Sequence, residues 1–295
     1  MRPLTPEGLT KLLGVPQRAA ASFTVETDRA EDGVRIRDLR LGPLGIPALC
    51  LSPEGAEHTP NAILYGHAHG NRYDIGRLEA VAGRPALRDP PLAIEFVRLG
   101  ATVICPDLAG FGGRQKEGTE SALAKAALWR GGSLMGQMAS DLLLALEVLQ
   151  CLARPRHTTS IGISMGGTLA YLTAALSDRI AACAHLCVFS DIAPLIKAGG
   201  HDLHGMYMTI PGLLPGHDMS DIAAIAAPRP QFVFTGGQDP LTPDDAYLPA
   251  VRRLEHAYSS SPDTLTALRD ASAGHHETPE SRQALMDWYR RVSSQ

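Results

Sequence analysis

The stretch TSIGISMGGTLAYLTAAL, residues 159–176, decides the fold that we expect for this chain. An apolar run leads into GISMG (162–166), and a run rich in small residues follows, which predicts a strand, a sharp turn and a helix. The two glycines let neighbouring backbone approach Ser164 without a clashing Cβ atom. The pattern is typical of a serine nucleophile above a strand end, with the Met165 amide facing a developing oxyanion. A tight turn that happens to contain a serine is the plainer alternative.

Outward from this stretch, short apolar runs alternate with helical segments along most of the chain. Residues 22–52 differ, because they read as an antiparallel meander broken by Gly, Pro and acidic turns. Nearly all-apolar strands that alternate with helices predict a parallel sheet covered on both faces. We therefore expect an α/β fold with a mostly parallel, eight-stranded sheet, and an irregular insertion after the sixth strand. The expected parallel strands are 62–65, 101–107, 159–163, 180–189, 231–237 and 264–271, and the expected helices include 5–13, 133–153 and three that begin near 165, 243 and 279.

Bulk properties limit the classes of function. The chain has 295 residues, 44% of them hydrophobic, and its 27 basic and 31 acidic side chains give a net charge of −4. That balance gives no reason to expect a nucleic-acid surface, and no apolar run approaches the roughly 20 residues of a membrane span. The five cysteines are scattered and the start lacks a secretory signal, so we expect reduced thiols in a cytoplasmic protein. The expected organisation is an N-terminal helical segment, 1–20, and a single domain, 21–295.

Two long segments interrupt the alternation of strands and helices. The first insertion, residues 109–132, holds a Gly-rich turn and the helix-like run ALAKAALWR. The second insertion, residues 190–218, is rich in Gly, Pro, His and Met and has no clear period. Such long loops are more often lids or binding segments than linkers, and both follow strand ends at the edge where open α/β sheets bind ligands. We expect Phe111, His204 and Tyr207 to contribute to a substrate pocket.

A serine nucleophile needs a base, and the base needs an acid that orients it. Asp239 stands in a Gly- and Pro-rich turn just past a strand end, and His275 follows the last strand. Their order after Ser164 is the order expected for a serine nucleophile on this kind of sheet. His276 is the alternative base, and Asp191, after the preceding strand, is the alternative acid. Each residue taken singly also fits a turn or a solvated loop.

The stretch YGHAHGN, residues 65–71, sets His67 and His69 after an early strand. Two histidines in this position also occur in metal-dependent hydrolases, but such a site needs further ligands on later strand ends, and no second cluster has suitable spacing. The loop after this strand supplies a backbone N–H to the oxyanion hole of serine hydrolases. We expect the His69 amide to do so beside that of Met165. Asp107, after the next strand, is interpreted as a structural hydrogen-bond anchor.

Several motifs together resemble the α/β-hydrolases of the dienelactone hydrolase-like group, in a branch with a serine nucleophile. The resemblance covers about residues 60–290 and implies an α/β-hydrolase fold and ester hydrolysis. The group's namesake uses a cysteine where this chain has Ser164, which favours general ester hydrolysis over that particular lactone. The motifs are HAHG (67–70), DLAGFGGR (107–114), GISMGG (162–167), HDMSDIAAIAAPRPQFVFTGGQDPLTP (217–243) and AGHHE (273–277).

The expected activity is hydrolysis of a carboxylic ester, or a related acyl bond, of a small molecule through an acyl-enzyme. Ser164, His275 and Asp239 form the expected triad, and this chemistry requires no cofactor, metal, nucleic acid or membrane. Two alternatives stay open: a metal-dependent hydrolase built on His67 and His69, and a non-catalytic relative that only binds a ligand. The fold hosts esterases, thioesterases, deacetylases, lactonases and peptidases, so the motifs do not name a substrate.

Overall fold

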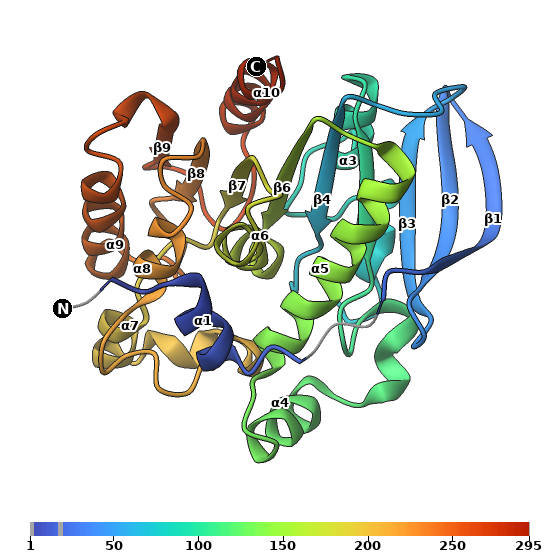
Figure 1. Ribbon diagram of the computed structural model, residues 1–295. Coiled ribbons are helices and arrows are strands. Elements are labelled where there is room, and N and C mark those ends of the chain that lie inside the picture. Colours follow the sequence, from blue (N-terminus) through green and yellow to red (C-terminus); the bar gives the residue numbers. More distant parts are fainter. Residues whose placement is uncertain (1–2, 17–19, 295) are drawn as a thin grey trace.

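The computed structural model describes residues 3–16 and 20–294, which form a nine-stranded sheet with helices on both faces (Figure 1). The strand order is β1-β2-β3-β5-β4-β6-β7-β8-β9. The α/β class and the mostly parallel sheet covered by helices are confirmed. The strands are β1 (Phe23–Glu31), β2 (Val34–Leu41), β3 (Ile46–Pro53), β4 (Asn61–Gly66), β5 (Thr102–Pro106), β6 (His157–Ile163), β7 (Ala182–Leu186), β8 (Gln231–Gly236) and β9 (Leu265–Asp270).

The prediction of eight strands was one too low for the described part of the chain. β1 lies at the edge of the sheet, where it pairs only with β2, and every one of its residues is exposed. β1 lies within residues 22–52, which were predicted to form an antiparallel meander, so the error was in the number of strands and not in the location of this one.

The parallel half of the sheet positions the loops that matter for function. Strands β4 to β9 run parallel, while β1, β2 and β3 pair antiparallel with one another and β3 pairs antiparallel with β5. The carboxyl ends of the parallel strands therefore lie at one edge, which is where such sheets bind ligands. The register pairs Gly66 with Gly162, so the loop after β4 begins beside the turn after β6.

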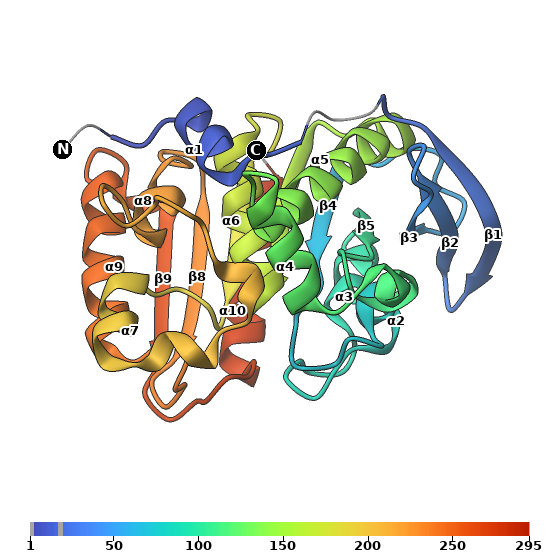
Figure 2. The ribbon, with the colours of Figure 1, turned by 90° about the horizontal axis from the view of Figure 1, so that it is seen from below.

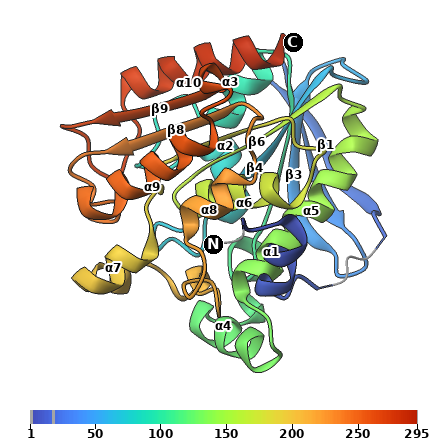
Figure 3. The ribbon, with the colours of Figure 1, turned by 60° about the vertical axis from the view of Figure 1, so that its left-hand side comes forward.

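Two hydrophobic cores lie between the sheet and the helices, one on each face. One core packs α1, α5, α6, α8 and α9 on one face, and the other packs α2, α3 and α10 on the opposite face. Figure 3 shows this arrangement at β8 and β9, with α9 and α10 on opposite sides. The helices are α1 (Pro6–Leu13), α2 (Glu79–Ala82), α3 (Leu92–Arg98), α4 (Glu120–Trp129), α5 (Leu134–Ala153), α6 (Met165–Leu176), α7 (Ile192–Ala198), α8 (Met219–Ala224), α9 (Asp244–Ala257) and α10 (Pro279–Ser293).

Helix α5 differs from the expectation that no segment is apolar enough to span a membrane. By length and composition its 20 residues qualify, as the one such helix among the described residues. However, 78% of its apolar window is buried inside the protein, where it packs against α6, β4 and β5. Burial in the core accounts for its composition, because a helix that is hydrophobic on most sides needs partners all round.

The two insertions lie at the same end of the molecule and stand clear of the sheet (Figures 1 and 2). The first contains a short 3₁₀ helix, Gly112–Glu117, and α4, as its helix-like run predicts. The second is less irregular than expected, since it begins with α7 and holds 3₁₀ helices at Gly200–Leu203 and Met206–Met208. At the other end of the chain, α1 fits the predicted helical segment 1–20, of which residues 1–2 and 17–19 lie outside the described residues.

Candidate active site

Ser164 sits on a sharp turn between β6 and α6. Its backbone has φ 55° and ψ −126°, a left-handed conformation that a non-glycine residue adopts only when its surroundings hold it. The Ser164 amide donates to the Leu186 carbonyl at 2.8 Å, which fixes the turn against β7. A Cβ atom on Gly162 or Gly166 would collide with backbone, so both glycines are required by close approach. Ser164 is partly exposed between buried neighbours, and its side chain lines the main cavity.

Asp239 and His275 meet at the ends of β8 and β9. The Nδ1 atom of His275 lies 2.7 Å from Oδ2 of Asp239, and the other carboxylate oxygen accepts the Leu241 amide at 2.9 Å. A proton on Nδ1 donates to this carboxylate and leaves Nε2 as a free base. Asp239 is buried, His275 is partly exposed, and both line the same cavity as Ser164. The sequence therefore paired the acid and the histidine that the structure brings into contact.

The alternative acid and base lie elsewhere. Asp191 accepts the Ser220 amide and a guanidinium N–H of Arg253, both at 3.0 Å, at the junction of α7, α8 and α9. Burial, reinforced by the nearby charge of Asp218, raises the pKa of Asp191 to about 6. His276 is exposed, and it does not line the cavity. Neither alternative can therefore replace a member of the pair at the ends of β8 and β9.

The segment 67–73 after β4, here called the β4 loop, turns its first histidine into the protein. The Leu108 amide donates to Nε2 of His67 at 3.1 Å, so the proton of the ring is on Nδ1, which donates to the Ala68 carbonyl at 3.1 Å. His67 is fully buried, and burial lowers its pKa to about 4. It is therefore neutral near pH 7 and holds the β4 loop against the loop after β5.

The second histidine of the β4 loop faces the first insertion. The Asn71 amide donates to Nδ1 of His69 at 3.1 Å, so the ring proton is on Nε2, 2.5 Å from Oε2 of Glu120. The hydroxyl of Tyr73 donates to the same oxygen at 3.0 Å, and the Tyr207 amide donates to Oε1 at 2.9 Å. Burial opposes ionisation of Glu120, but these hydrogen bonds outweigh it and lower the pKa of the carboxyl group. A buried, ionised carboxylate thus joins the β4 loop to both insertions.

A second buried carboxylate holds the β4 loop from the opposite side. Glu79 accepts the Ala68 amide at 3.0 Å and the hydroxyl of Tyr65 at 2.8 Å, and it forms an ion pair with Arg84. Arg84 also donates to the Ala68 carbonyl at 2.9 Å. The N–H and the carbonyl oxygen of Ala68 therefore both have hydrogen-bond partners. The next N–H along the chain, that of His69, remains the candidate oxyanion donor on this loop.

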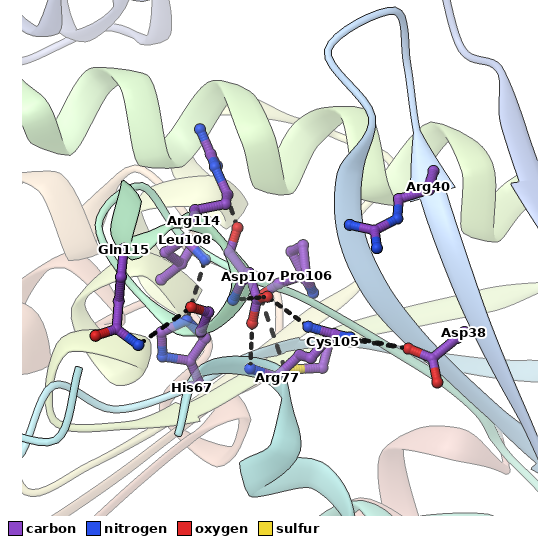
Figure 4. Close-up of polar contacts among 12 residues, drawn as sticks. Asp38, Arg40, His67, Arg77, Cys105, Pro106, Asp107, Leu108, Arg114 and Gln115 are labelled. Carbon is purple, nitrogen blue, oxygen red and sulfur yellow. Dashed lines mark hydrogen bonds and ion pairs between the residues drawn. The ribbon is translucent and has the colours of Figure 1, made fainter. Parts of the chain in front are cut away.

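Asp107 acts as the structural anchor that the sequence indicates. Its carboxylate accepts the Arg77 amide at 2.7 Å, an Arg77 guanidinium N–H at 2.6 Å and the Gly113 amide at 2.8 Å (Figure 4). The guanidinium group of Arg77 also donates to the carboxylate of Asp38 on β2 at 3.0 Å. Asp107 is fully buried and does not line the cavity, so its contacts fix the start of the first insertion.

A cavity of about 1030 Å³ opens above Ser164, between the two insertions. His204 and Tyr207 line it as expected. His204 is largely buried, which lowers its pKa, and its Nε2–H donates to the Leu241 carbonyl at 3.2 Å. Phe111 was wrongly expected in this wall. It is completely buried behind it and packs its ring on His67, His69 and Tyr73 with centroid distances of 5.0–5.2 Å.

The histidine pair does not form a metal site. All four ring nitrogens of His67 and His69 already have hydrogen-bond partners, and the two rings face different parts of the protein. Within residues 3–16 and 20–294, no group of three or more His, Cys, Asp or Glu side chains is arranged to hold a metal ion. The geometry therefore argues against the metal-dependent alternative.

Sequence reasoning missed Glu120, Glu79 and Arg84. In the sequence, Glu120 follows Thr119 at the start of a helix-like run, which is the ordinary place for an acidic residue near a helix N-terminus. Its partner His69 is 51 positions away. A contact between loops at such a separation leaves no periodic signal. It arises because the first insertion follows β5, the strand that pairs with β4, and folds against the β4 loop.

Comparisons with known proteins agree with this fold. Residues 85–207 match a family model described as the alpha/beta hydrolase fold. YtaP of Bacillus subtilis (strain 168), a protein named as a hydrolase, is 35% identical over 293 residues, covering 95% of this chain and 97% of YtaP. A protein of Bacteroides fragilis NCTC 9343 named as an acetyl xylan esterase superposes with a TM-score of 0.73 at 16% identity, over 97% of this chain and 86% of that one. A glucuronoyl esterase from Solibacter usitatus superposes with a TM-score of 0.68 at 11% identity, over 97% of this chain and 92% of that one.

Proposed function

The chain belongs to the α/β-hydrolase fold family, and from this premise we propose that it cleaves a small, uncharged carboxylic ester through a Ser-His-Asp triad. The single observation that carries the proposal is the 2.7 Å contact between His275 and Asp239 in the cavity that Ser164 lines. A histidine oriented in this way by a carboxylate is the base that a serine hydroxyl needs.

The proposed reaction has two halves. His275 takes the proton of the Ser164 hydroxyl at Nε2 while Oγ attacks the ester carbonyl, and the same proton then goes to the departing alcohol. Water repeats the attack on the acyl-enzyme with His275 as base, which releases the acid and restores Ser164. Asp239 keeps Nδ1 protonated and stabilises the imidazolium between transfers.

Two backbone amides stabilise the tetrahedral intermediate in this proposal. Met165 is the first residue of α6, where an N–H has no partner within the helix and the helix dipole is positive. The His69 amide approaches from the β4 loop. One such donor is worth about 3 kcal/mol of transition-state stabilisation.

The charge of the cavity favours an uncharged substrate. Among the described residues that line it, none is a lysine or an arginine, whereas Glu120 and Asp202 are acidic. A carboxylate, sulfate or phosphate on the substrate would find no cation there and would face like charge. Neutral hydrogen-bonding side chains, including Asn71 and Gln115, instead suit a polar but uncharged ester.

The finer family assignment is also a proposal. We place the chain in the dienelactone hydrolase-like group, in the branch with a serine nucleophile, on the strength of the five sequence motifs. The fold neighbours named as esterases are consistent with ester hydrolysis, but their low sequence identity speaks for the fold alone.

A fluorophosphonate probe tests the proposed function. We expect the protein to be labelled, to cleave short-chain chromogenic esters, and to lose both properties in Ser164→Ala. Labelling that persists in Ser164→Ala, or ester cleavage that is abolished by chelators and survives this substitution, would contradict the proposal. A series of esters with increasing acyl length then defines the acyl group.

A further inference from the structure

Glu120 lines the cavity, but its carboxylate is directed to other parts of the protein. It is the first residue of α4, it is 6% exposed, and it lines the cavity while its carboxylate points to the β4 loop. Its two oxygens accept three hydrogen bonds from two segments: the His69 ring and the Tyr73 hydroxyl of the β4 loop, and the Tyr207 amide of the second insertion. Nε2 of His69 is the donor that comes nearest to this carboxylate, at 2.5 Å.

The aromatic rings around this carboxylate limit the freedom of the His69 side chain. The ring of Tyr207 stacks on it with a centroid distance of 5.7 Å and an interplanar angle of 27°. Tyr73 and Phe111 meet it edge-on at 5.1 and 5.2 Å. Burial and the contact with Glu120 raise the pKa of Tyr73 to about 12, so its hydroxyl stays protonated and remains a donor.

These contacts act on one peptide group. Glu79 and Arg84 hold the Ala68 backbone on one side of it, and Glu120 holds the His69 side chain on the other. The direction of the His69 N–H is determined by both. Glu79 and Arg84 lie close behind β4 in the sequence, whereas Glu120 belongs to the first insertion, so the second contact links the β4 loop to that insertion.

We propose that Glu120 is a positioning residue that fixes the His69 amide for oxyanion stabilisation, so that the first insertion is part of the catalytic apparatus and not only a cover. This inference rests on the proposed function, because it assigns the His69 amide its role in ester cleavage. Glu120 itself does not touch the reacting atoms. Its removal lets the β4 loop relax without changing the triad.

The test compares Glu120→Ala with Glu117→Ala, a matched control. Glu117 is an acidic residue of the same insertion that is paired with Arg114 and does not line the cavity. We expect Glu120→Ala to lower kcat roughly 10- to 100-fold with KM within about threefold of the parent, since a shift of about 1 Å in a catalytic group has this effect. Affinity for a phenylboronic acid, which forms a tetrahedral adduct on the nucleophile, should fall in parallel. Glu117→Ala should leave both values within about twofold of the parent.

A conservative variant distinguishes the effect of the Glu120 hydrogen bonds from the effect of the volume of its side chain. An amide at position 120 offers one acceptor oxygen, while its NH₂ group must face one of the three donors, so Glu120→Gln should fall between the parent and Glu120→Ala. Equal kcat for Glu120→Gln and Glu120→Ala, both far below the parent, would show that charge and not the contact with His69 is responsible. That result would overturn the proposal.

Hydrogen exchange gives a readout that does not depend on turnover. Amides of residues 67–72 should exchange at least about tenfold faster in Glu120→Ala than in Glu117→Ala, because local opening becomes easier. Unchanged exchange, kcat within twofold of the parent, or a raised KM with unchanged kcat would each overturn the proposal. If the parent shows no Ser164-dependent cleavage, the proposed function fails, and exchange still decides whether Glu120 holds the loop.

Discussion

His67 and His69 are separated by one residue on the β4 loop and both pack on Phe111, yet their hydrogen bonds join the loop to different parts of the protein. On the buried side, His67 and the ion pair of Glu79 with Arg84 are enclosed by the core. On the pocket side, His69 meets Glu120 at the wall of the cavity. The contrast separates two tasks. The buried side stabilises the fold, and in our proposal the pocket side positions the His69 amide.

The largest effect is expected on the pocket side, at the acid. Asp239→Asn preserves shape but no longer favours His275 with Nδ1 protonated and Nε2 free, so kcat should fall by about 10⁴ while the midpoint of thermal unfolding changes little. Asp191→Asn, from the neighbouring strand end, is the control and should lower kcat less than tenfold. Steady-state kinetics on a chromogenic ester measures both. A loss below tenfold for Asp239→Asn would remove this residue from the triad.

The second prediction concerns the buried side. Glu79→Ala leaves the Arg84 charge and the Ala68 amide without their partner, so the free energy of unfolding should fall by about 3–5 kcal/mol. Glu120→Ala, on the pocket side, should cost less than half of that, because the residue lines the cavity and water there can bind the donors that it leaves. Urea unfolding compares the two variants. Equal losses of unfolding free energy in Glu79→Ala and Glu120→Ala would show that the two sides of the β4 loop do not differ in their contribution to stability.

The third prediction uses pH. The pKa of His67 is about 4 in the folded protein, below its ordinary value of about 6.5, so between these values the unfolded state binds more protons and stability falls as pH is lowered. This group alone accounts for a decrease on the order of 3 kcal/mol from pH 7 to pH 4. His67→Gln should flatten the profile of unfolding free energy against pH by that amount. A slope in His67→Gln equal to that of the parent would contradict the assignment.

The smallest expected effect sharpens the description of the pocket side. A neutral chromogenic butyrate ester should exceed the matching hemisuccinate in kcat/KM by roughly tenfold, because the anionic acyl group meets Glu120 and Asp202 and no cation. Added salt should narrow the ratio through screening. Asp202→Asn should reduce it as well. Equal rates for the two esters would show that the acidic wall does not reach the acyl group.

Local patterns carried most of what the sequence could predict. The turn at Ser164 is encoded by five adjacent residues, and the alternation of apolar strands with helices requires a parallel sheet. Asp239 and His275 could be paired because each follows a strand whose direction is already determined. The edge strand β1 belongs to the meander predicted over residues 22–52, although the total number of strands was set one too low.

What the sequence could not provide are contacts between separate loops. Phe111 stands in a Gly-rich turn and looked like a pocket residue, but the rings of the β4 loop enclose it. Glu120 looked like an ordinary acidic residue at a helix start. Its importance follows from the distance to His69, which depends on how the first insertion folds back over the sheet.

The dual position of Glu120 also bears on protein engineering. Chimeras that exchange residues 109–132 for the corresponding segment of another scaffold alter the rim that contacts the substrate, and at the same time remove the carboxylate that holds the His69 ring. A graft that reshapes selectivity while preserving turnover must therefore reinstate an acceptor at the first position of α4, within hydrogen-bond reach of that imidazole.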